Sequence, residues 1–258
     1  MARCNGHKAD GIRCRIKFNV NDLGFCRFHE WQGRPRCQGV NTDTKEPCTN
    51  HAKKDYTYCC AAHDPTLEYI APRVFDPLDF YLRRQVEADV VERYNSNDIY
   101  NHETLDMKTP NALELDHIVE KQIFSFAMIQ TGIRQGDGDF DVATDVLREN
   151  VVNELDNLAL TRRNTNRIKG TGVFKYLDDS RTGHCEQSFT GYLLTAKRDG
   201  ETLTRDVSRR IRRNMGRSIK KCQRKLSDEG DTPVLEKLST QLQQLYVDME
   251  LKVRHTQQ

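Results

Sequence analysis

Seven of the nine cysteines lie within the first 60 residues, and their spacing repeats. The first set has nine, eleven and two residues between successive members, which are Cys4, Cys14, Cys26 and His29. The second set has ten, eleven and two, and its members are Cys37, Cys48, Cys60 and His63. One single-residue gap aligns the sets, which gives an internal period of 33–34 residues. Three thiolates and one imidazole form the closed tetrahedral set of structural zinc, so the sequence predicts two structural zinc ions.

Each unit is too small to build a core of its own, so zinc is expected to supply most of its folding free energy. In the second unit Cys59 and His51 could also reach a metal, but the register of the first unit favours Cys60 and His63. The alternative is a scatter of buried cysteines, which two matched four-ligand sets make the weaker interpretation.

The two units resemble the WRC zinc motif of plant transcriptional regulators, in which three cysteines and a histidine have similar spacing. This resemblance implies a DNA-facing role. Basic side chains surround the ligands, at Arg3, Lys8, Arg13, Arg15, Lys17, Arg27, Arg34 and Arg36. Such side chains suit contacts with phosphates, and the alternative is the solvated surface of a scaffold.

Two later blocks could carry chemistry. Apolar and polar residues alternate over residues 113–119, which predicts a half-buried strand containing Asp116 and His117. Neighbours on a regular strand point to opposite faces, so these two side chains converge only at a bend or bulge. A second block begins with an apolar run at Asn157 and passes into a helical stretch that we expect to end at Gly170.

These blocks, LDHIV and NLALTRRNTNRIKG, resemble the Asn-type branch of the HNH (ββα-metal) endonuclease motif over roughly residues 113–172. The resemblance implies that His117 is the general base and that Asp116 and Asn166 hold Mg²⁺ or Mn²⁺. It further implies that Asn157 fixes the loop and orients His117, while Lys169 contacts the phosphate. This chain departs from the compact motif by an insert of about forty residues between His117 and Asn157, with helices expected at Ile123–Ile133 and Val142–Leu155.

The implied chemistry is hydrolysis of a phosphodiester bond. A neutral imidazole can remove the proton of the attacking water near pH 7. A hard divalent ion with oxygen ligands can bind the phosphate and the leaving 3′ oxygen. One acid and one amide form a sparse ligand set, so water and substrate oxygens are expected to complete it.

Residues 205–225 hold ten Lys or Arg against one acid, with apolar residues at helical spacing. This predicts an amphipathic helix with a very basic face. Nucleic acid is the partner we expect for Arg209, Arg210, Arg212, Arg213, Arg217, Lys220 and Lys221. A calmodulin-like target or a nuclear-import signal would have a similar sequence.

Two further helices are expected. One covers Leu78–Tyr94 and joins the modules. The other begins after Pro233 and runs to about Val253, with apolar residues at Leu238, Leu242, Leu245 and Met249. This last helix packs against the chain's own body or forms a homodimer.

The sequence therefore predicts an α+β protein with two zinc-stapled units, a ββα-metal core with a helical insertion, and flanking helices. The expected domains are residues 1–33, 34–66, a helical linker at 67–104, the nuclease core at 105–180 and a basic region at 181–258. The predicted function is that of a metal-dependent DNA endonuclease. The alternative is a non-catalytic, zinc-dependent DNA-binding regulator with an HNH-like scaffold.

The net charge is only +2, and no apolar run is long enough for a signal peptide or a membrane span. We therefore expect a soluble intracellular protein with reduced cysteines, nuclear in a eukaryote and otherwise cytoplasmic.

Overall fold

The computed structural model describes residues 3–41, 44–78, 82–109, 112–230 and 232–251. The chain divides into two compact units, Met1–Glu68 and Tyr69–Gln258, here called the N-terminal unit and the C-terminal unit. Among the described residues, no helix combines the length and the apolar character needed to cross a membrane.

The N-terminal unit consists mainly of loops. Its regular structure is limited to the 3₁₀ helices Glu30–Gly33 and Ala61–His63 and to isolated bridges such as that between Arg36 and His51. Its hydrophobic cluster is formed largely by three buried cysteines. A unit with so little apolar burial depends on the groups that the cysteines bind.

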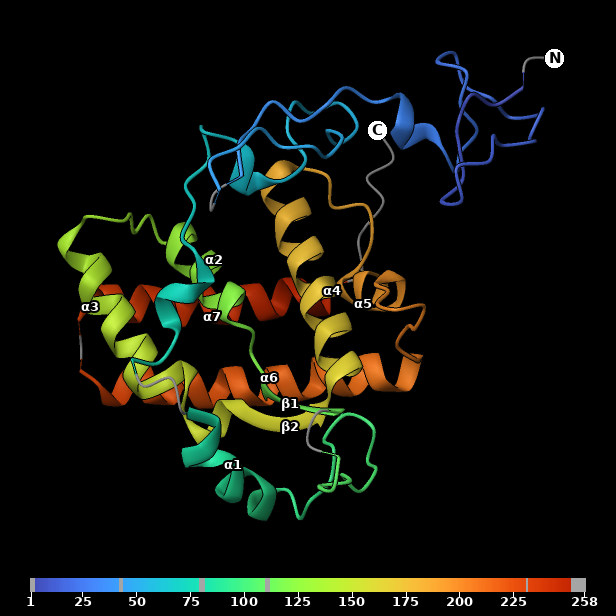
Figure 1. Ribbon diagram of the computed structural model, residues 1–258. Coiled ribbons are helices and arrows are strands. Elements are labelled where there is room, and N and C mark those ends of the chain that lie inside the picture. Colours follow the sequence, from blue (N-terminus) through green and yellow to red (C-terminus); the bar gives the residue numbers. More distant parts are fainter. Residues whose placement is uncertain (1–2, 42–43, 79–81, 110–111, 231, 252–258) are drawn as a thin grey trace. The chain divides into compact units, whose positions relative to one another are not determined.

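The C-terminal unit contains seven α-helices and one two-stranded sheet in its described part (Figure 1). Their bounds are α1 Leu82–Arg93, β1 Leu113–His117, α2 Lys121–Gln130, α3 Gly138–Leu147, β2 Leu158–Arg162, α4 Arg163–Thr182, α5 Phe189–Thr195, α6 Arg205–Asp228 and α7 Pro233–Glu250. This is the mixed arrangement of helices and a small sheet that the sequence predicts.

Strands β1 and β2 pair antiparallel without a bulge, with Asp116 opposite Ala159 and His117 opposite Leu158. Helices α1 and α4 lie on opposite sides of this pair (Figure 1). Leu113 and Leu158 belong to a small apolar cluster on the face of the sheet that packs against α1. Asp116 lies on the other face, towards α4. Because the ladder is regular through His117, neighbouring side chains alternate between the faces. The two motif residues of β1 therefore do not converge.

The insert between the strands folds as α2 and α3, followed by a π-helical turn at Arg148–Val152. These helices correspond to the two that the sequence predicts. Helix α2 is buried along most of its length and joins the main core, which also receives α3, α4 and α5.

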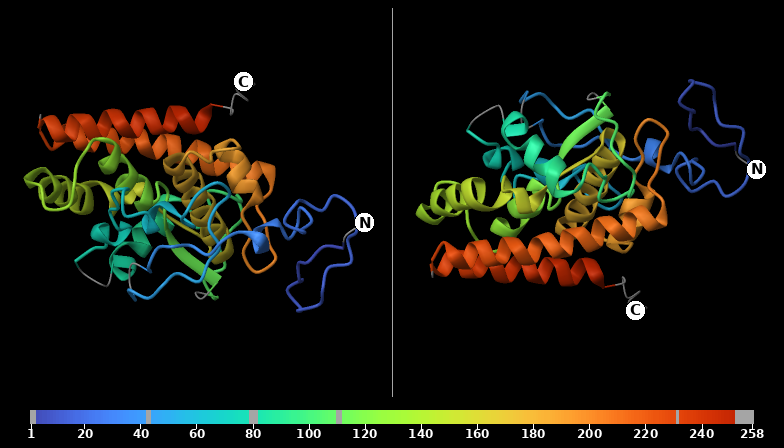
Figure 2. Two further views of the ribbon diagram at one scale, coloured as in Figure 1. Left: turned by 90° about the horizontal axis from the view of Figure 1, so that it is seen from above. Right: turned by 90° about the horizontal axis from the view of Figure 1, so that it is seen from below.

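Helices α6 and α7 lie side by side along one edge of the C-terminal unit (Figure 2). Thr204 caps the start of α6, because its hydroxyl accepts the N–H of Val207 at 3.2 Å, and α7 begins at Pro233. Their contact is largely apolar, and the leucines at 238, 242 and 245 are buried in the chain's own core. Dimerisation through α7 stays an untested prediction, although the residues that suggest it are already covered.

The predicted end of the helix in the second motif block was wrong. Helix α4 does not end at Gly170, since it continues to Thr182 and is capped by Gly183 with φ 75°. A glycine inside a helix lowers its stability by about 1 kcal/mol relative to alanine. Burial of Val173 and Leu177, which lie beyond Gly170, outweighs this cost. Helix α1 begins at Leu82, whereas residues 79–81 and Val253, included in the expected helices, lie outside the described residues.

Candidate functional site

Four ligand atoms meet in the first half of the N-terminal unit. They lie within 4.8 Å of one another and come from Cys4, Cys14, Cys26 and His29. His29 Nδ1 lies 3.6 Å from Cys4 Sγ and 3.3 Å from Cys26 Sγ. This is the first set that the sequence predicts, and three sulfurs with one nitrogen can bind a structural zinc ion.

The second cluster consists of Cys37, Cys48, Cys59 and His63. The prediction of Cys60 was therefore wrong. Cys59 Sγ lies 3.7 Å from Cys48 Sγ and 3.2 Å from His63 Nδ1. His51 stays outside the cluster, because its Nδ1 donates to the carbonyl of Arg34 at 2.9 Å.

The backbone explains the choice of Cys59. Its N–H donates to Cys37 Sγ at 3.3 Å, just as the Cys26 N–H donates to Cys4 Sγ at 3.2 Å. Cys59 is thus the counterpart of Cys26. Two residues separate Cys26 from His29, whereas three separate Cys59 from His63. An alignment that uses a single gap does not show this difference.

A glycine follows two residues after the first cysteine of each cluster. The N–H of Gly6 donates to Cys4 Sγ at 3.3 Å, and that of Gly39 donates to Cys37 Sγ at 3.4 Å. A Cβ at Gly6 would lie 2.3 Å from His29 Cβ, and one at Gly39 would lie 2.5 Å from His63 Cβ. Only glycine lets the loop approach the histidine so closely.

The thiols of the first cluster differ in acidity. Burial raises the pKa of Cys4, but N–H donors from Cys26 and Gly6 outweigh it and lower that pKa to about 6. Burial raises the pKa of Cys26, and the neighbouring Cys4 and Cys14 thiols add to the effect. The protein alone therefore favours the thiolate at Cys4 and disfavours it at Cys26, whereas a divalent metal stabilises both thiolates. This charge requirement fits zinc.

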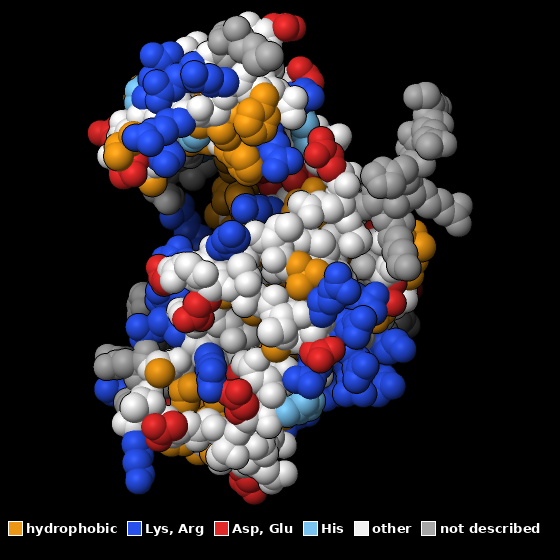
Figure 3. Space-filling view, turned by 90° about the vertical axis from the view of Figure 1, so that its right-hand side faces the viewer, with side chains coloured by type: hydrophobic (Ala, Val, Ile, Leu, Met, Phe, Trp, Pro, Cys, Tyr) orange, Lys and Arg blue, Asp and Glu red, His pale blue; other side chains and the backbone are white. Residues whose placement is uncertain are grey.

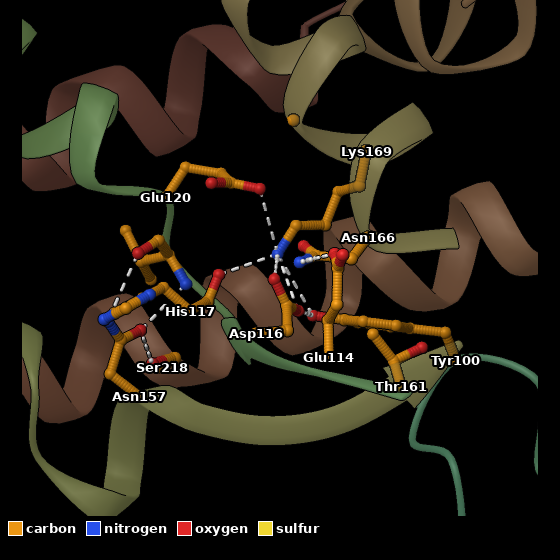
Figure 4. A network of polar contacts seen from close by, with 12 residues as sticks. Tyr100, Glu114, Asp116, His117, Glu120, Asn157, Thr161, Asn166, Lys169 and Ser218 are labelled. Atoms are coloured by element: carbon orange, nitrogen blue, oxygen red, sulfur yellow. Dashed lines mark hydrogen bonds and ion pairs between the residues drawn. The ribbon is translucent and has the colours of Figure 1, made fainter. Parts of the chain in front are cut away.

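In the C-terminal unit, the two motif blocks meet between β1 and α4 (Figure 4). Lys169 Nζ donates to Asp116 Oδ1 at 2.6 Å, to Asp116 Oδ2 at 2.7 Å and to the His117 carbonyl at 2.7 Å. The side chains of Lys169 and Asp116 are 0% and 1% exposed. A phosphate contact by Lys169 would require this amine to leave Asp116.

Two residues complete the surroundings of the buried ion pair. The Tyr100 hydroxyl donates to Asp116 Oδ2 at 2.6 Å, and Glu120 Oε1 lies 3.3 Å from Lys169 Nζ (Figure 4). Burial raises the pKa of Asp116 despite the nearby ammonium, and it raises the pKa of Glu120 to about 7. Burial lowers the pKa of Lys169, but the two carboxyl groups outweigh it and raise that pKa. The Lys169 ammonium thus forms ion pairs with the carboxyl groups of both Asp116 and Glu120.

His117 has a different environment from Asp116. Its Nε2 lies 3.0 Å from Asn153 Oδ1, while Asn153 Nδ2 donates to the carbonyls of Phe75 and Arg148 at 3.0 and 2.9 Å. These two bonds orient the amide so that its oxygen faces the imidazole, and His117 Nε2 therefore carries the proton. Burial, with a contribution from Lys121, lowers the pKa of His117 to about 3. The ring is neutral near pH 7, with its lone pair on Nδ1.

Asn157 is fully buried and holds the chain that follows His117. Its Oδ1 accepts the Val119 N–H at 2.8 Å and the Ser218 hydroxyl at 2.9 Å, and its Nδ2 donates to Val119 O at 3.2 Å and to Val152 O at 2.9 Å. The contact with Ser218 connects this loop to α6. The position agrees with the loop-fixing role that the HNH resemblance implies, although Asn157 does not touch the imidazole in any described contact.

Asn166 is not directed at Asp116. Its Nδ2 donates to Glu114 Oε2 at 3.1 Å, and Glu114 also pairs with Arg163 and Arg167 of α4. Tyr100, Glu120 and Asn153 also belong to this site, although no motif in the sequence includes them. Glu120 had a detectable signal, a carboxylate directly after the apolar pair that follows His117. Tyr100 and Asn153 belong to no pattern, since only folding brings them to β1.

The basic residues of α6 fall into two groups. Several are paired, as Lys221 lies 2.9 Å from Asp156, Arg212 lies 3.2 Å from Glu250 and Arg209 lies 3.5 Å from Asp206. Arg210 donates to the Tyr100 carbonyl at 3.0 Å. The exposed members that form no ion pair with a described residue include Arg213, Arg217 and Lys220.

No protein-family model matches this chain, and no significant match occurs among curated proteins or solved structures.

We expect Cys59→Ser to lose one of two bound zinc ions, because a hydroxyl is a far poorer zinc ligand than a thiolate. Cys60→Ser is the matched control and should retain both. Zinc per chain, measured by mass spectrometry of the purified proteins, tests this. Loss of zinc from Cys60→Ser alone would contradict the assignment.

Lys169→Met should lower the free energy of unfolding by about 3–5 kcal/mol, because it leaves the buried carboxyl group of Asp116 without its cation. Urea denaturation measures the change. Lys175→Met is the control, since Lys175 lies on the exposed face of the same helix. Equal stability of both variants would show that the ion pair does not stabilise the fold.

Glu120→Gln should change the pH dependence of stability. The pKa of Glu120 is about 7 when folded, against 4.5 for the ordinary carboxyl, so its contribution to stability is lost as pH rises from 4.5 through 7. The glutamine lacks this loss. The free energy of unfolding of Glu120→Gln relative to that of the wild type should therefore increase as pH rises from 4.5 to 7, as measured by denaturation at several pH values. A difference that stays constant with pH would contradict the assignment.

Proposed function

We propose that this protein is a phosphodiester hydrolase of the HNH type that acts on DNA. One observation carries the proposal. Lys169, from the second motif block, bonds to Asp116 and to the backbone of His117, from the first, within a β1–β2–α4 unit. The order strand, strand, helix and the contact between the blocks are what the motif resemblance implies. They support this interpretation because the blocks are separated by a long insert.

In the proposed reaction His117 acts as the general base. Its Nδ1 has the lone pair, because Nε2 donates to Asn153. A water molecule attacks phosphorus and gives its proton to Nδ1, while the bond from phosphorus to the 3′ oxygen breaks and that oxygen leaves with the bonding electrons. A pKa of about 3 makes the free imidazole a weak base. The negative charge of a bound phosphate would raise this pKa towards the working pH.

The proposed Mg²⁺ or Mn²⁺ does not fit the present arrangement of Asp116 and Asn166. Both oxygens of Asp116 accept from Lys169, and the amide of Asn166 donates to Glu114. Within the described part of the chain, the groups of three or more Cys, His, Asp or Glu with converging ligand atoms are the two Cys/His clusters. The proposed metal dependence therefore rests on the motif resemblance, and no catalytic step is derived through the ion.

A second candidate function is that of a non-catalytic, zinc-dependent DNA-binding regulator. The buried ion pair between Lys169 and Asp116 favours this candidate. A buried carboxylate with an ammonium partner and a hydrogen bond from Tyr100 is also what a structural scaffold would contain. The two candidates differ at His117, which a scaffold does not need as a base.

We expect His117→Ala to abolish cleavage of plasmid DNA by the zinc-loaded protein in Mg²⁺ or Mn²⁺, while DNA binding in a gel-shift assay persists. His184→Ala is the control, because His184 lies after the end of α4, where its Nδ1 is 3.1 Å from the Thr182 hydroxyl. This variant should retain full activity. Cleavage that survives in His117→Ala would exclude the base assignment. Binding without cleavage by the wild type in either metal would favour the regulator.

A further inference from the structure

The surface between α6 and the segment before β1 contains a cavity of about 360 Å³. Three arginines from successive turns of α6 line it, at positions 210, 213 and 217. The opposite wall comes from the loop at residues 94–102, including Asn97 and His102. Lys and Arg side chains gather towards the right of Figure 3, the side of the C-terminal unit on which α6 runs. We call this cavity the arginine pocket.

The arginine pocket retains its positive charge. Arg213 and Arg217 are exposed and form no ion pair with a described residue, in contrast to Lys221, Arg212 and Arg209 of the same helix. The carboxylate of the pocket, Asp98, is 1% exposed. It is already engaged by the N–H of Tyr100 at 2.7 Å and the hydroxyl of Thr161 at 2.6 Å. It therefore supports the loop and does not neutralise the guanidinium groups at the opening.

The loop wall is held in place from α6. Arg210 donates to the Tyr100 carbonyl at 3.0 Å, and Asn214 donates to the Ile99 carbonyl at 3.2 Å. Tyr100 then reaches through to Asp116, at 2.6 Å. The pocket is thus built on the same short segment that supports Asp116.

We infer that the arginine pocket binds the phosphodiester backbone of a nucleic-acid duplex, with Arg213 and Arg217 contacting phosphates. Guanidinium groups bind phosphate oxygens through paired hydrogen bonds, and an open, unneutralised pocket suits a continuous anionic chain better than a small enclosed ligand. The choice of nucleic acid rests on the proposed function, but the binding does not require cleavage.

The test compares two neutralising double variants of the full-length, zinc-loaded protein. Arg213→Gln with Arg217→Gln removes the two pocket charges. Arg205→Gln with Arg224→Gln removes two exposed charges of the same helix that do not line the pocket. Binding of a fluorescent duplex is followed by anisotropy against KCl concentration without added Mg²⁺ or Mn²⁺, using DNA and RNA duplexes of the same sequence.

The pocket variant should bind roughly tenfold more weakly, and the slope of log K against log salt should fall by about 2, one unit for each lost phosphate contact. The control should change affinity less than twofold. The duplex with the larger pocket-dependent loss identifies the natural ligand. Equal losses in the two variants, no loss in the pocket variant or no binding by the wild type would overturn the inference.

A change on the loop wall checks the result independently of α6. His102→Glu places a carboxylate at the exposed rim of the pocket and should weaken binding in the same direction. Unchanged binding in this variant would also count against the pocket. Because cleavage is measured separately with added metal, a failure of the pocket and a failure of the proposed hydrolysis are distinguishable.

Discussion

The C-terminal unit depends on one buried ammonium group. Lys169 is fully enclosed, and its three donors serve Asp116, Glu120 and the backbone at His117. Removing two carboxyl groups from water is costly unless a cation and hydrogen bonds compensate. Meeting this requirement holds α4 against β1 and places the Tyr100 hydroxyl on Asp116.

The N-terminal unit meets a similar requirement with different chemistry. There, buried sulfur atoms receive backbone N–H donors, and the clusters can bind zinc to neutralise the thiolates. In the C-terminal unit a lysine already neutralises the acid that the motif resemblance assigns to a metal. The described part of the chain thus has two converging ligand clusters of the type that can bind zinc, and a further polar cluster in which the cation is Lys169. This difference separates the well-supported zinc sites from the proposed catalytic ion.

Much of the fold was accessible from the sequence because the patterns were local. Helical spacing predicted α6 and the helices of the insert, and strand alternation placed Asp116 and His117 on opposite faces. Other features depended on tertiary contacts. Burial of Val173 carries α4 past Gly170, and a single N–H to sulfur bond selects Cys59 over Cys60. The burial of Lys169 was equally inaccessible, since the sequence alone does not distinguish a buried lysine from an exposed one.

The long insert has a consequence for how this protein folds. Strands β1 and β2 are neighbours in space but are separated by residues 118–157, so their pairing is a non-local contact. Closing such a loop is slow unless the intervening chain is already compact. Helices α2 and α3 have local contacts and can form first, after which Asn157 joins the end of the insert to Val119. The strand pair that carries the motif residues is therefore expected to assemble late, on a helical insert that has already formed.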